Sequence, residues 1–408
     1  MHAFGSSLAA RAAPWLVLLS LGLCREARAE TELRESSVTI SEEWAMVREL
    51  RRANLLHGER DLDLDRIPAE ADLSSLILRS RRVPLEVLSL ERAETGHDVV
   101  HCRIRSPVEA ARAGLDIMYR MRGLRWEALY EIVVRGEGED EREPVSCDLR
   151  GMIRVVNATT RTFSNTLVRI EQLEQSGDSG RRSGPGFLVL DRADPLSDLW
   201  FDRAGEPAIP YQFIIPRRVN LAAHSETEIP LIVRVRTPAW RFYEMVAEEV
   251  PTGRREPMPL RKYISFRHED ERDEKAAMLP AGRVRVYAGA RRRHFVQEAR
   301  FQRTLRGGEI RVDLGLSDDV KAWRVAGPRV KLPGGGMGES SEIRIRNEGD
   351  TDVRVEVDEK PATTLGWSLI SSTMPCREVS NRLRFSLTLG AGMEERIGYE
   401  FRLREPEI

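Results

Sequence analysis

The residue pair most suggestive of catalysis is His101 and Ser179. His101 lies in Val99-Val100-His101-Cys102, and Ser179 lies in Gly177-Asp178-Ser179-Gly180. A serine nucleophile beside a histidine base, with an oriented aspartate and two backbone donors, performs acyl transfer. Here Arg181 replaces the glycine that should follow the serine motif, and the surrounding residues are rich in Gly, Ser and Pro. A loop of that composition loses the orientation that a nucleophile needs. We therefore predict no Ser179-dependent hydrolysis.

His97, His101 and Cys102 are the candidate metal ligands. The two valines between the histidines favour a strand. On a strand His97 and His101 would stand about 13 Å apart, at about 3.3 Å per residue, which is too far to chelate one ion. We predict no metal site, no cofactor and no catalytic residues, and the sequence leaves the binding residues open.

Three other motifs have ordinary structural explanations. Asp61-Leu62-Asp63-Leu64-Asp65 begins like a calcium loop, but Arg66 stands where that loop needs glycine, so we predict an amphipathic strand with outward carboxylates. The glycines of residues 334–338 lack the Lys-Ser/Thr of a phosphate loop and precede a predicted strand. Asn157-Ala158-Thr159 is formally an N-glycosylation acceptor.

Aromatic residues are candidates for binding or for the core. Trp240, Phe242 and Tyr243 form a local cluster that could bind carbohydrate, although such residues more often pack in a core. Trp126 lies two residues after Leu124, so strand spacing places both on one apolar face. We predict that Trp126 is structural.

Residues 1–29 have the organisation of a secretory signal. Arg11 and the free amine supply positive charge, residues 12–23 form a short apolar run, and Ala27-Arg28-Ala29 is a small-x-small cleavage pattern. We predict export to the periplasm or the extracellular space, with cleavage between Ala29 and Glu30. The apolar run is shorter than the about 20 residues that span a bilayer, so we predict no stable transmembrane anchor.

A lipoprotein is an alternative, because Cys24 follows the apolar run. Leu23 argues against it, since the residue before a lipidated cysteine is normally small. Three cysteines remain after cleavage, Cys102, Cys147 and Cys376, and an odd number allows at most one internal bridge. A Cys102–Cys147 bridge and three free thiols both stay open.

The charge balance excludes one class of partner. There are 64 basic and 65 acidic residues, which give a formal charge of −1. A nucleic-acid binder needs a basic footprint that this chain lacks, so we predict no nucleic-acid partner. Removing 29 of the 408 residues leaves 379, enough for two or three domains.

Alternation of apolar and polar residues is the strongest structural signal. Residues 343–345 and 353–357 alternate around an Asn-Glu-Gly-Asp turn, and residues 383–389 and 397–403 alternate around Gly390-Ala391-Gly392. We predict a hairpin from each pair. Shorter apolar runs recur upstream, at residues 129–134, 152–156, 187–190, 229–235, 263–266, 284–287 and 310–314.

The predicted fold is therefore all-β, with two or three antiparallel sandwich-like domains and little helix. Residues 42–56 and 166–175 fit helix or strand equally well, and no repeat of solenoid period is present. The predicted domains are residues 30–107, 108–236 and 237–408, with a flexible loop at 175–186.

Ordered motifs along the mature chain resemble a bacterial family of unknown function called mucoidy-inhibitor-A-like. The carrying segments are residues 115–119 (LDIMY), 123–130 (GLRWEALY), 148–159 (DLRGMIRVVNAT), 279–282 (LPAG) and 313–315 (DLG). The segments 45–49, 65–68, 78–80, 211–216 and 286–287 are similar to further landmarks of that family. The chain lacks the long coiled coil of many members. The resemblance implies export and β-rich domains, and it transfers no catalytic residues.

These observations lead to one favoured function and two alternatives. We predict an exported, non-enzymatic envelope protein that binds another envelope component, either a protein or a polysaccharide. The alternatives are a secreted hydrolase with dispersed catalytic carboxylates and a carbohydrate-binding module. The ligand and the oligomeric state stay open.

Overall fold

The computed structural model describes residues 29–93, 98–135, 144–172, 211–268, 278–289, 293–305, 307–333, 335–361, 363 and 366–403. Their regular structure consists of strands in several mostly antiparallel sheets, which confirms the all-β prediction. None of the described residues belongs to a helix long and apolar enough to cross a bilayer.

The N-terminal strands are β1 (Ala29–Glu30), β2 (Glu32–Ile40), β3 (Ala45–Leu55), β4 (Gly58–Leu64), β5 (Ala71–Ser80), β6 (Glu86–Arg92), β7 (Val100–Ser106) and β8 (Ala110–Met121). The central strands are β9 (Leu124–Arg135), β10 (Val145–Asn157), β11 (Phe163–Gln172), β12 (Tyr211–Leu221), β13 (Ser225–Val246), β14 (Met258–Arg267), β15 (Met278–Leu279), β16 (Gly282–Ala288), β17 (His294–Phe301) and β18 (Thr304–Leu305). The C-terminal strands are β19 (Glu309–Lys331), β20 (Met337–Asn347), β21 (Val353–Glu359), β22 (Trp367–Ser372), β23 (Arg377–Val379), β24 (Arg382–Leu389) and β25 (Glu394–Leu403).

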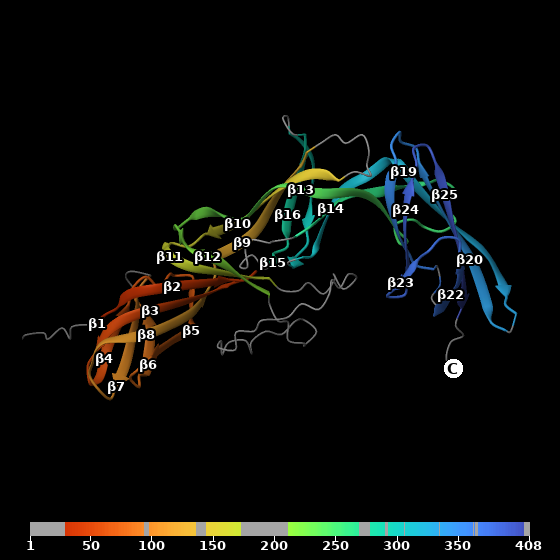
Figure 1. Cartoon of the computed structure of the whole chain (residues 1–408). Helices are drawn as coiled ribbons and strands as arrows, with labels where there is room; N and C mark the ends of the chain where they lie inside the picture. The colour runs from red at the N-terminus through yellow and green to blue at the C-terminus, as the bar shows by residue number, and fades with distance from the viewer. Residues whose placement is uncertain are drawn as a thin grey trace, which may run out of the picture.

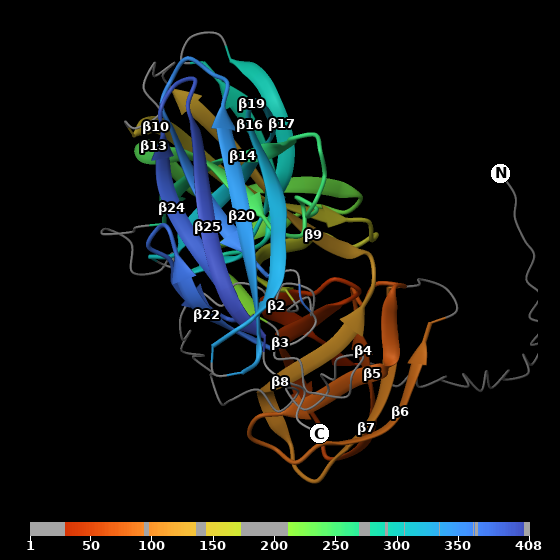
Figure 2. The same ribbon diagram turned by 90° about the vertical axis from the view of Figure 1, so that its right-hand side faces the viewer.

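The molecule has the shape of an arch, with β1 to β8 at one end and β20 to β25 at the other (Figure 1). One sheet has the order β1-β4-β7-β6 and another the order β12-β11-β2-β3-β8-β5. The largest sheet follows the path β17-β16-β9-β10-β13-β14-β19-β20-β25-β22, and β21, β24 and β23 join it beside β13. Turned by 90°, the long strands β19, β20 and β25 run side by side (Figure 2).

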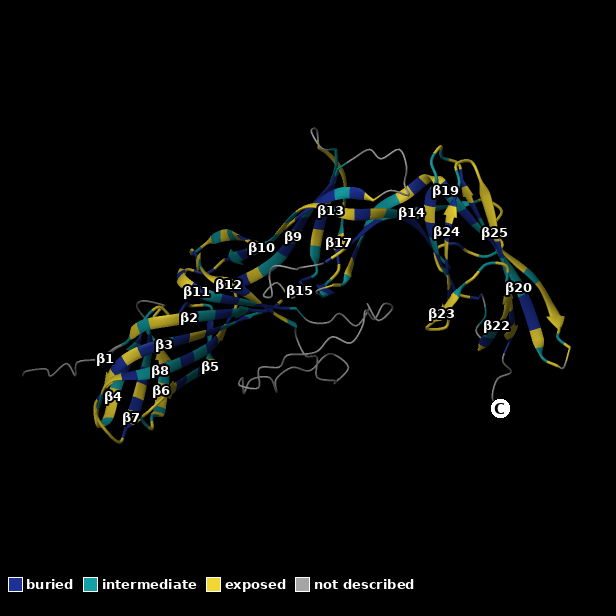
Figure 3. Ribbon diagram, in the orientation of Figure 1, coloured by how far each residue is buried: buried dark blue, intermediate teal, exposed yellow. Residues whose placement is uncertain are grey.

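Two hydrophobic cores hold these sheets together. The first extends from Val38 to Val312, and the second from Tyr243 to Leu403. Buried and exposed residues alternate along the strands that line both cores (Figure 3). The strands β13 and β19 contribute residues to each core, and the predicted boundary between residues 236 and 237 falls inside β13. The domain boundaries stay predictions.

The two predicted hairpins are wrong, although all four strands exist. β20 pairs with β19 and β25, whereas β21 pairs with β13 and β24. β24 likewise does not pair with β25, its successor in the chain. β20 and β25 lie in the part of the largest sheet that continues from β13 through β14, whereas β21 and β24 lie in the branch that pairs directly with β13. The apolar faces of both parts point into the second core. Alternation reports which face is buried and does not report the pairing partner.

The segments that fitted helix or strand equally well are strands, because β3 and β11 cover most of them. The predicted loop at 175–186 and the apolar run at 187–190 lie outside the described residues.

The chain repeats one strand arrangement. In the first unit (residues 32–235), β2 pairs with β3, β3 with β8, β9 with β10 and β10 with the start of β13. In the second unit (residues 240–403), the end of β13 pairs with β14, β14 with β19, β19 with β20 and β20 with β25. Each unit also has one parallel pair at the same place, β2 with β11 and the end of β13 with β21.

A buried asparagine forms the same corner in both units. The Nδ2 group of Asn157 donates to the carbonyls of Arg161 (2.7 Å), Leu221 (3.2 Å) and Ala222 (2.9 Å). Nδ2 of Asn347 donates to the carbonyls of Thr351 (2.7 Å), Leu389 (3.4 Å) and Gly390 (3.0 Å). In each case Oδ1 accepts from the backbone N–H two residues later, at 3.1 and 3.0 Å. With Asn157 only 1% exposed, the glycosylation motif has a structural role here.

Candidate functional site

Of the His101–Ser179 pair that the sequence singled out for catalysis, the structure describes only His101. Ser179 and His97 lie outside the described residues. The Nδ1 atom of His101 is 2.7 Å from Oδ1 of Asp63, which joins β7 to β4. Among the described residues, no three His, Cys, Asp or Glu side chains converge as metal ligands.

The acidic run at residues 61–65 forms the end of β4 and the residue after it. Leu62 and Leu64 are fully buried, whereas the aspartates are partly exposed. Asp63 contacts His101, and Asp65 accepts a hydrogen bond from Arg51 at 2.7 Å. The amphipathic strand that the sequence predicts is confirmed.

The three cysteines are free thiols. Cys102 and Cys147 are buried, and burial raises the pKa of each thiol to about 12. Such thiols stay protonated at neutral pH and are poor nucleophiles.

The aromatic cluster at residues 240–243 does not form one surface. Phe242 and Tyr243 are 2% and 3% exposed and point to opposite sides of β13, whereas Trp240 is 39% exposed. A stacking platform for a sugar ring would need several of these rings on one accessible face. The core interpretation holds for Phe242 and Tyr243.

One hollow in the described residues lies beside Trp126. Its volume is about 240 Å³. It lies where the turn after β2, the start of β9, the end of β11 and the residues before β16 meet, and it is lined by Ser41, Glu42, Arg125, Trp126, Glu127, Ala128, Gln172, Ala281 and Gly282.

Backbone contacts hold the walls of this hollow in place. The side chain of Gln172 accepts from the N–H of Ala281 (2.9 Å) and donates to its carbonyl (3.2 Å). The Tyr130 hydroxyl donates to the carbonyl of Pro280 at 2.7 Å. A Cβ atom on Gly282 would lie 2.1 Å from the carbonyl oxygen of Ala128, so only glycine lets β16 approach β9 this closely.

A second hollow of about 440 Å³ adjoins the first and shares Glu127, Gln172, Ala281 and Gly282 with it. It extends along β16 and β17 to Arg283, Glu298, Ala299 and Arg300. Together the two hollows form what we call the Trp126 trough.

The trough combines an aromatic ring with charged side chains. Arg283 donates to Glu127 at 2.8 Å, and Arg285 donates to Glu298 at 3.0 Å. Glu42 and Arg125 are exposed at the rim. Trp126 shares the inward face of β9 with Leu124, as predicted, but its ring is only partly buried and its Nε1 has no hydrogen-bond partner.

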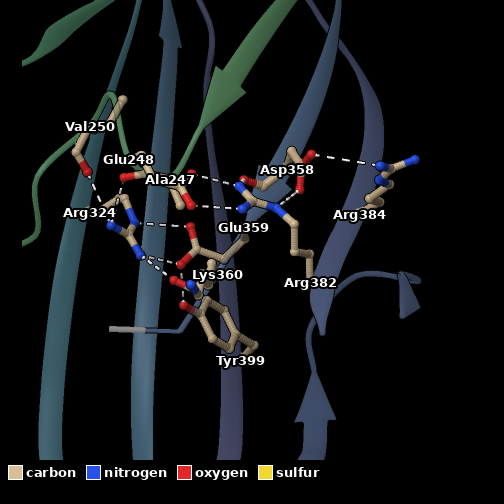
Figure 4. Close-up of polar contacts among 10 residues, drawn as sticks. All are labelled: Ala247, Glu248, Val250, Arg324, Asp358, Glu359, Lys360, Arg382, Arg384 and Tyr399. Atoms are coloured by element: carbon tan, nitrogen blue, oxygen red, sulfur yellow. Dashed lines mark hydrogen bonds and ion pairs between the residues drawn. The ribbon is translucent and has the colours of Figure 1, made fainter. Parts of the chain in front are cut away.

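The second unit contains a buried polar network between the two parts of its sheet (Figure 4). Nε of Arg324 donates to Glu359 (2.9 Å), and the guanidinium also donates to the carbonyls of Ala247 (3.0 Å), Val250 (3.2 Å) and Lys360 (2.8 Å). The Tyr399 hydroxyl completes it with a 2.7 Å hydrogen bond to Glu359.

Burial raises the pKa of Glu359, although Arg324 and Tyr399 oppose the shift. A carboxyl with a raised pKa is the usual mark of a general acid. Glu359 is 0% exposed, however, and both of its oxygens have partners within the network. This network fills the space between the two parts of the sheet and offers no room for a substrate.

A smaller network lies in the first core. Arg51 is fully buried and pairs with Glu49 at 2.6 Å, and Arg161 pairs with Glu49 and Tyr119. These residues connect β3, β8 and the corner after β10. They are enclosed in the core, which leaves the Trp126 trough as the candidate site.

No family model matches this chain, and a comparison with curated proteins found no relative.

Sequence reasoning missed the trough because its walls come from distant segments. Glu42, Gln172 and Ala281 are separated by more than a hundred residues each, and none belongs to a recognisable motif. Trp126 was the single available signal, and strand spacing alone assigns it to the core.

Proposed function

We propose that this protein is an exported, non-enzymatic binding protein of the cell envelope and that the Trp126 trough receives its ligand. The observation that carries the proposal is the partly buried Trp126 ring in an open hollow whose walls are fixed by the Gln172–Ala281 hydrogen bonds. An aromatic ring with polar groups arranged around it is a common composition for a binding site.

The charges of the trough favour binding over hydrolysis. A hydrolase with carboxylate catalysis needs one acid and one base in contact with the substrate. Glu127 is held by Arg283, and Glu298 is held by Arg285. The carboxyl with a raised pKa, Glu359, is sealed in the second unit.

The envelope location rests on the sequence. Residues 1–29 have the order of a cleavable export signal. The resemblance to the mucoidy-inhibitor-A-like family supports the same location. The predicted cleavage bond, between Ala29 and Glu30, joins the two residues of β1.

The test is differential capture from the native envelope. Mature protein carrying Trp126→Leu is compared with wild type and with Trp240→Leu, a matched control that replaces an exposed tryptophan elsewhere on the fold. We expect a component that co-purifies with wild type and with the control to be lost from the Trp126 variant. Identical sets from all three proteins would overturn the proposal.

A further inference from the structure

The two units place different residues at one equivalent position on their inner walls. Ala128 pairs with Ile153 and Arg324 pairs with Ile343. Each of these isoleucines lies four residues before the corner asparagine of its unit, Asn157 or Asn347. Ala128 in the first unit is therefore the counterpart of Arg324 in the second.

Glu359, the carboxylate partner of Arg324, also corresponds to an apolar residue in the first unit. Arg48 binds Asp116 in the first unit as Arg261 binds Asp313 in the second, at 3.0 and 2.9 Å. Their cross-strand neighbours are Ser37 and Glu244.

Counting three residues onward from Ser37 and Glu244 gives Ile40 and Ala247. Ile40 pairs with Ile170, and Ala247 donates its N–H to the residue just before Glu359. Ile170 therefore stands where the second unit has Glu359.

Ala128, the counterpart of Arg324, lines the first hollow of the Trp126 trough. By the same register, Ser41 and Glu42 correspond to Glu248 and Glu249. β16 runs parallel to β9 near Gly282. The corresponding contact in the second unit is the parallel bridge between Thr252 and Arg324. In the first unit, small and apolar side chains stand at the positions of the arginine and its carboxylate partner.

We propose that the first hollow of the Trp126 trough binds an arginine side chain from an extended segment of a partner polypeptide. The inference rests on the proposed function and names the chemistry of the partner. The second unit supplies the argument, because the same framework there holds a guanidinium between a carboxylate and three backbone carbonyls.

The walls of the hollow fit this ligand. The face of Trp126 attracts a cation, and the exposed carboxylate of Glu42 supplies an opposite charge. The planar guanidinium suits such a site better than an ammonium, because it stacks on rings and donates in several directions. Arg125 at the rim opposes binding through its like charge. The adjoining hollow gives room for the peptide backbone on either side of the arginine.

The direct test uses two blocked peptides, Gly-Gly-Arg-Gly-Gly and the same peptide with citrulline in place of arginine. Citrulline keeps the shape of the side chain and removes its charge. We expect the mature protein to bind the arginine peptide at least about ten-fold more tightly in titration calorimetry at low salt. Equal affinity for the two peptides, or no binding of either, would overturn the inference.

Two substitutions at the rim should change the affinity for the arginine peptide in opposite directions. Neither alters the buried residues of the hollow. Glu42→Gln should weaken binding of the arginine peptide about three-fold, and Arg125→Gln should strengthen it by a similar factor. Neither variant should change the affinity for the citrulline peptide. Effects of the same sign in both variants would contradict the proposed position of the guanidinium.

A transplant tests the equivalence of the units. Ala128→Arg with Ile170→Glu should fill the first hollow and abolish peptide binding. Circular dichroism checks that the variant is folded, and a folded variant that still binds the arginine peptide would count against the inference.

The outcomes separate the inference from the proposed function. If envelope capture depends on Trp126 but the two peptides bind equally, the trough is a binding site and its ligand is not an arginine. If wild type and Trp126→Leu capture the same envelope components, the proposed function itself fails.

Discussion

At the scale of single residues, the most informative side chains are those whose burial is incomplete or whose charge is enclosed. Trp126 is partly buried at the edge of the first core, and Glu359 is an enclosed carboxylate in the second. The sequence marks Trp126 through strand spacing. The alternation of Val353, Val355 and Val357 also places Glu359 on the inward face, but it gives no sign that Arg324 is its partner.

Replacing Trp126 with alanine should lower the free energy of unfolding, but by less than the about 3 to 5 kcal/mol typical of a fully buried aromatic ring. The reason is that part of the ring already faces the hollow. Urea denaturation of the mature protein measures this, with Trp126→Phe as the control that keeps most of the contact. A full-sized loss would mean that the ring is enclosed, and no loss that it contributes nothing to the core.

Replacing Glu359 with glutamine should destabilise the protein by about 3 to 5 kcal/mol, because the Arg324 guanidinium stays buried without its counter-charge. The double variant Arg324→Met with Glu359→Leu should recover only part of this loss. An apolar pair avoids burying charge, but three backbone carbonyls lose the Arg324 donor and the Tyr399 hydroxyl loses its acceptor. Denaturant unfolding of the wild type, the single variant and the double variant measures both effects. A single variant as stable as the wild type would show that Arg324 does not depend on Glu359.

Acid stability should depend in part on Glu248. Hydrogen bonds from Arg382, both at 2.7 Å, lower the pKa of this carboxyl from its ordinary 4.5 to about 2. Because the folded-state pKa is lowered, the stabilisation is present above about pH 4.5 and is lost as the pH falls toward 2. Glu248→Gln should therefore flatten the decline in stability over this window. The effect is modest, because the side chain is half exposed. Thermal unfolding between pH 2 and 6 tests it, and an unchanged slope would contradict the assignment.

At the scale of elements, the sequence predicts strands better than it predicts their partners. The alternation of β20, β21, β24 and β25 is clear in the sequence, and all four exist. Their order around the core is not encoded in the alternation, because a strand that crosses to the other part of the sheet buries the same side chains as one that turns back. The corner residues, Asn157 and Asn347, decide between these possibilities by closing the crossover with side-chain hydrogen bonds.

The repeated strand arrangement explains a short sequence similarity between the two units. Residues 153–157 read Ile-Arg-Val-Val-Asn, and residues 343–347 read Ile-Arg-Ile-Arg-Asn. The two copies lie 190 positions apart, far beyond the period of solenoid repeats. Their likeness becomes meaningful only when the hydrogen bonds of both asparagines are seen to match.

Asn157→Ala and Asn347→Ala should each destabilise the protein by about 2 kcal/mol or more. Each removes the donor for several carbonyls, and a buried polar group left without a partner costs about 1 to 3 kcal/mol. Similar losses are expected in the two variants because the corners have the same contacts. Chemical denaturation measures both, with Ser164→Ala, on the exposed part of β11, as the control. A loss confined to one corner would argue against their equivalence.

At the scale of the whole molecule, the two cores share three strands, the long β13 and β19 and the shorter β14. β13 and β19 each begin among first-core residues and contribute further residues to the second core. A strand that is continuous through both cores fixes their connection more firmly than a flexible linker does. The cores themselves are separate sets of side chains, so each can open without exposing all of the other.

We therefore expect the cores to open at different free energies, as cooperative units do in native-state exchange. Asn347→Ala should speed amide hydrogen exchange in β20, β21, β24 and β25 by about ten-fold or more, since about 1.4 kcal/mol corresponds to a factor of ten. The amides of β2, β3 and β8 should change little in that variant, and Asn157→Ala should give the reverse pattern. Mass spectrometry of peptic fragments after exchange in low urea resolves these segments. In β13 and β19, exchange should change in both variants. Amides beside the first core should respond to Asn157→Ala, and amides beside the second core should respond to Asn347→Ala. If either substitution accelerates exchange throughout the molecule, the two cores unfold as one unit, and β13 and β19 couple them completely.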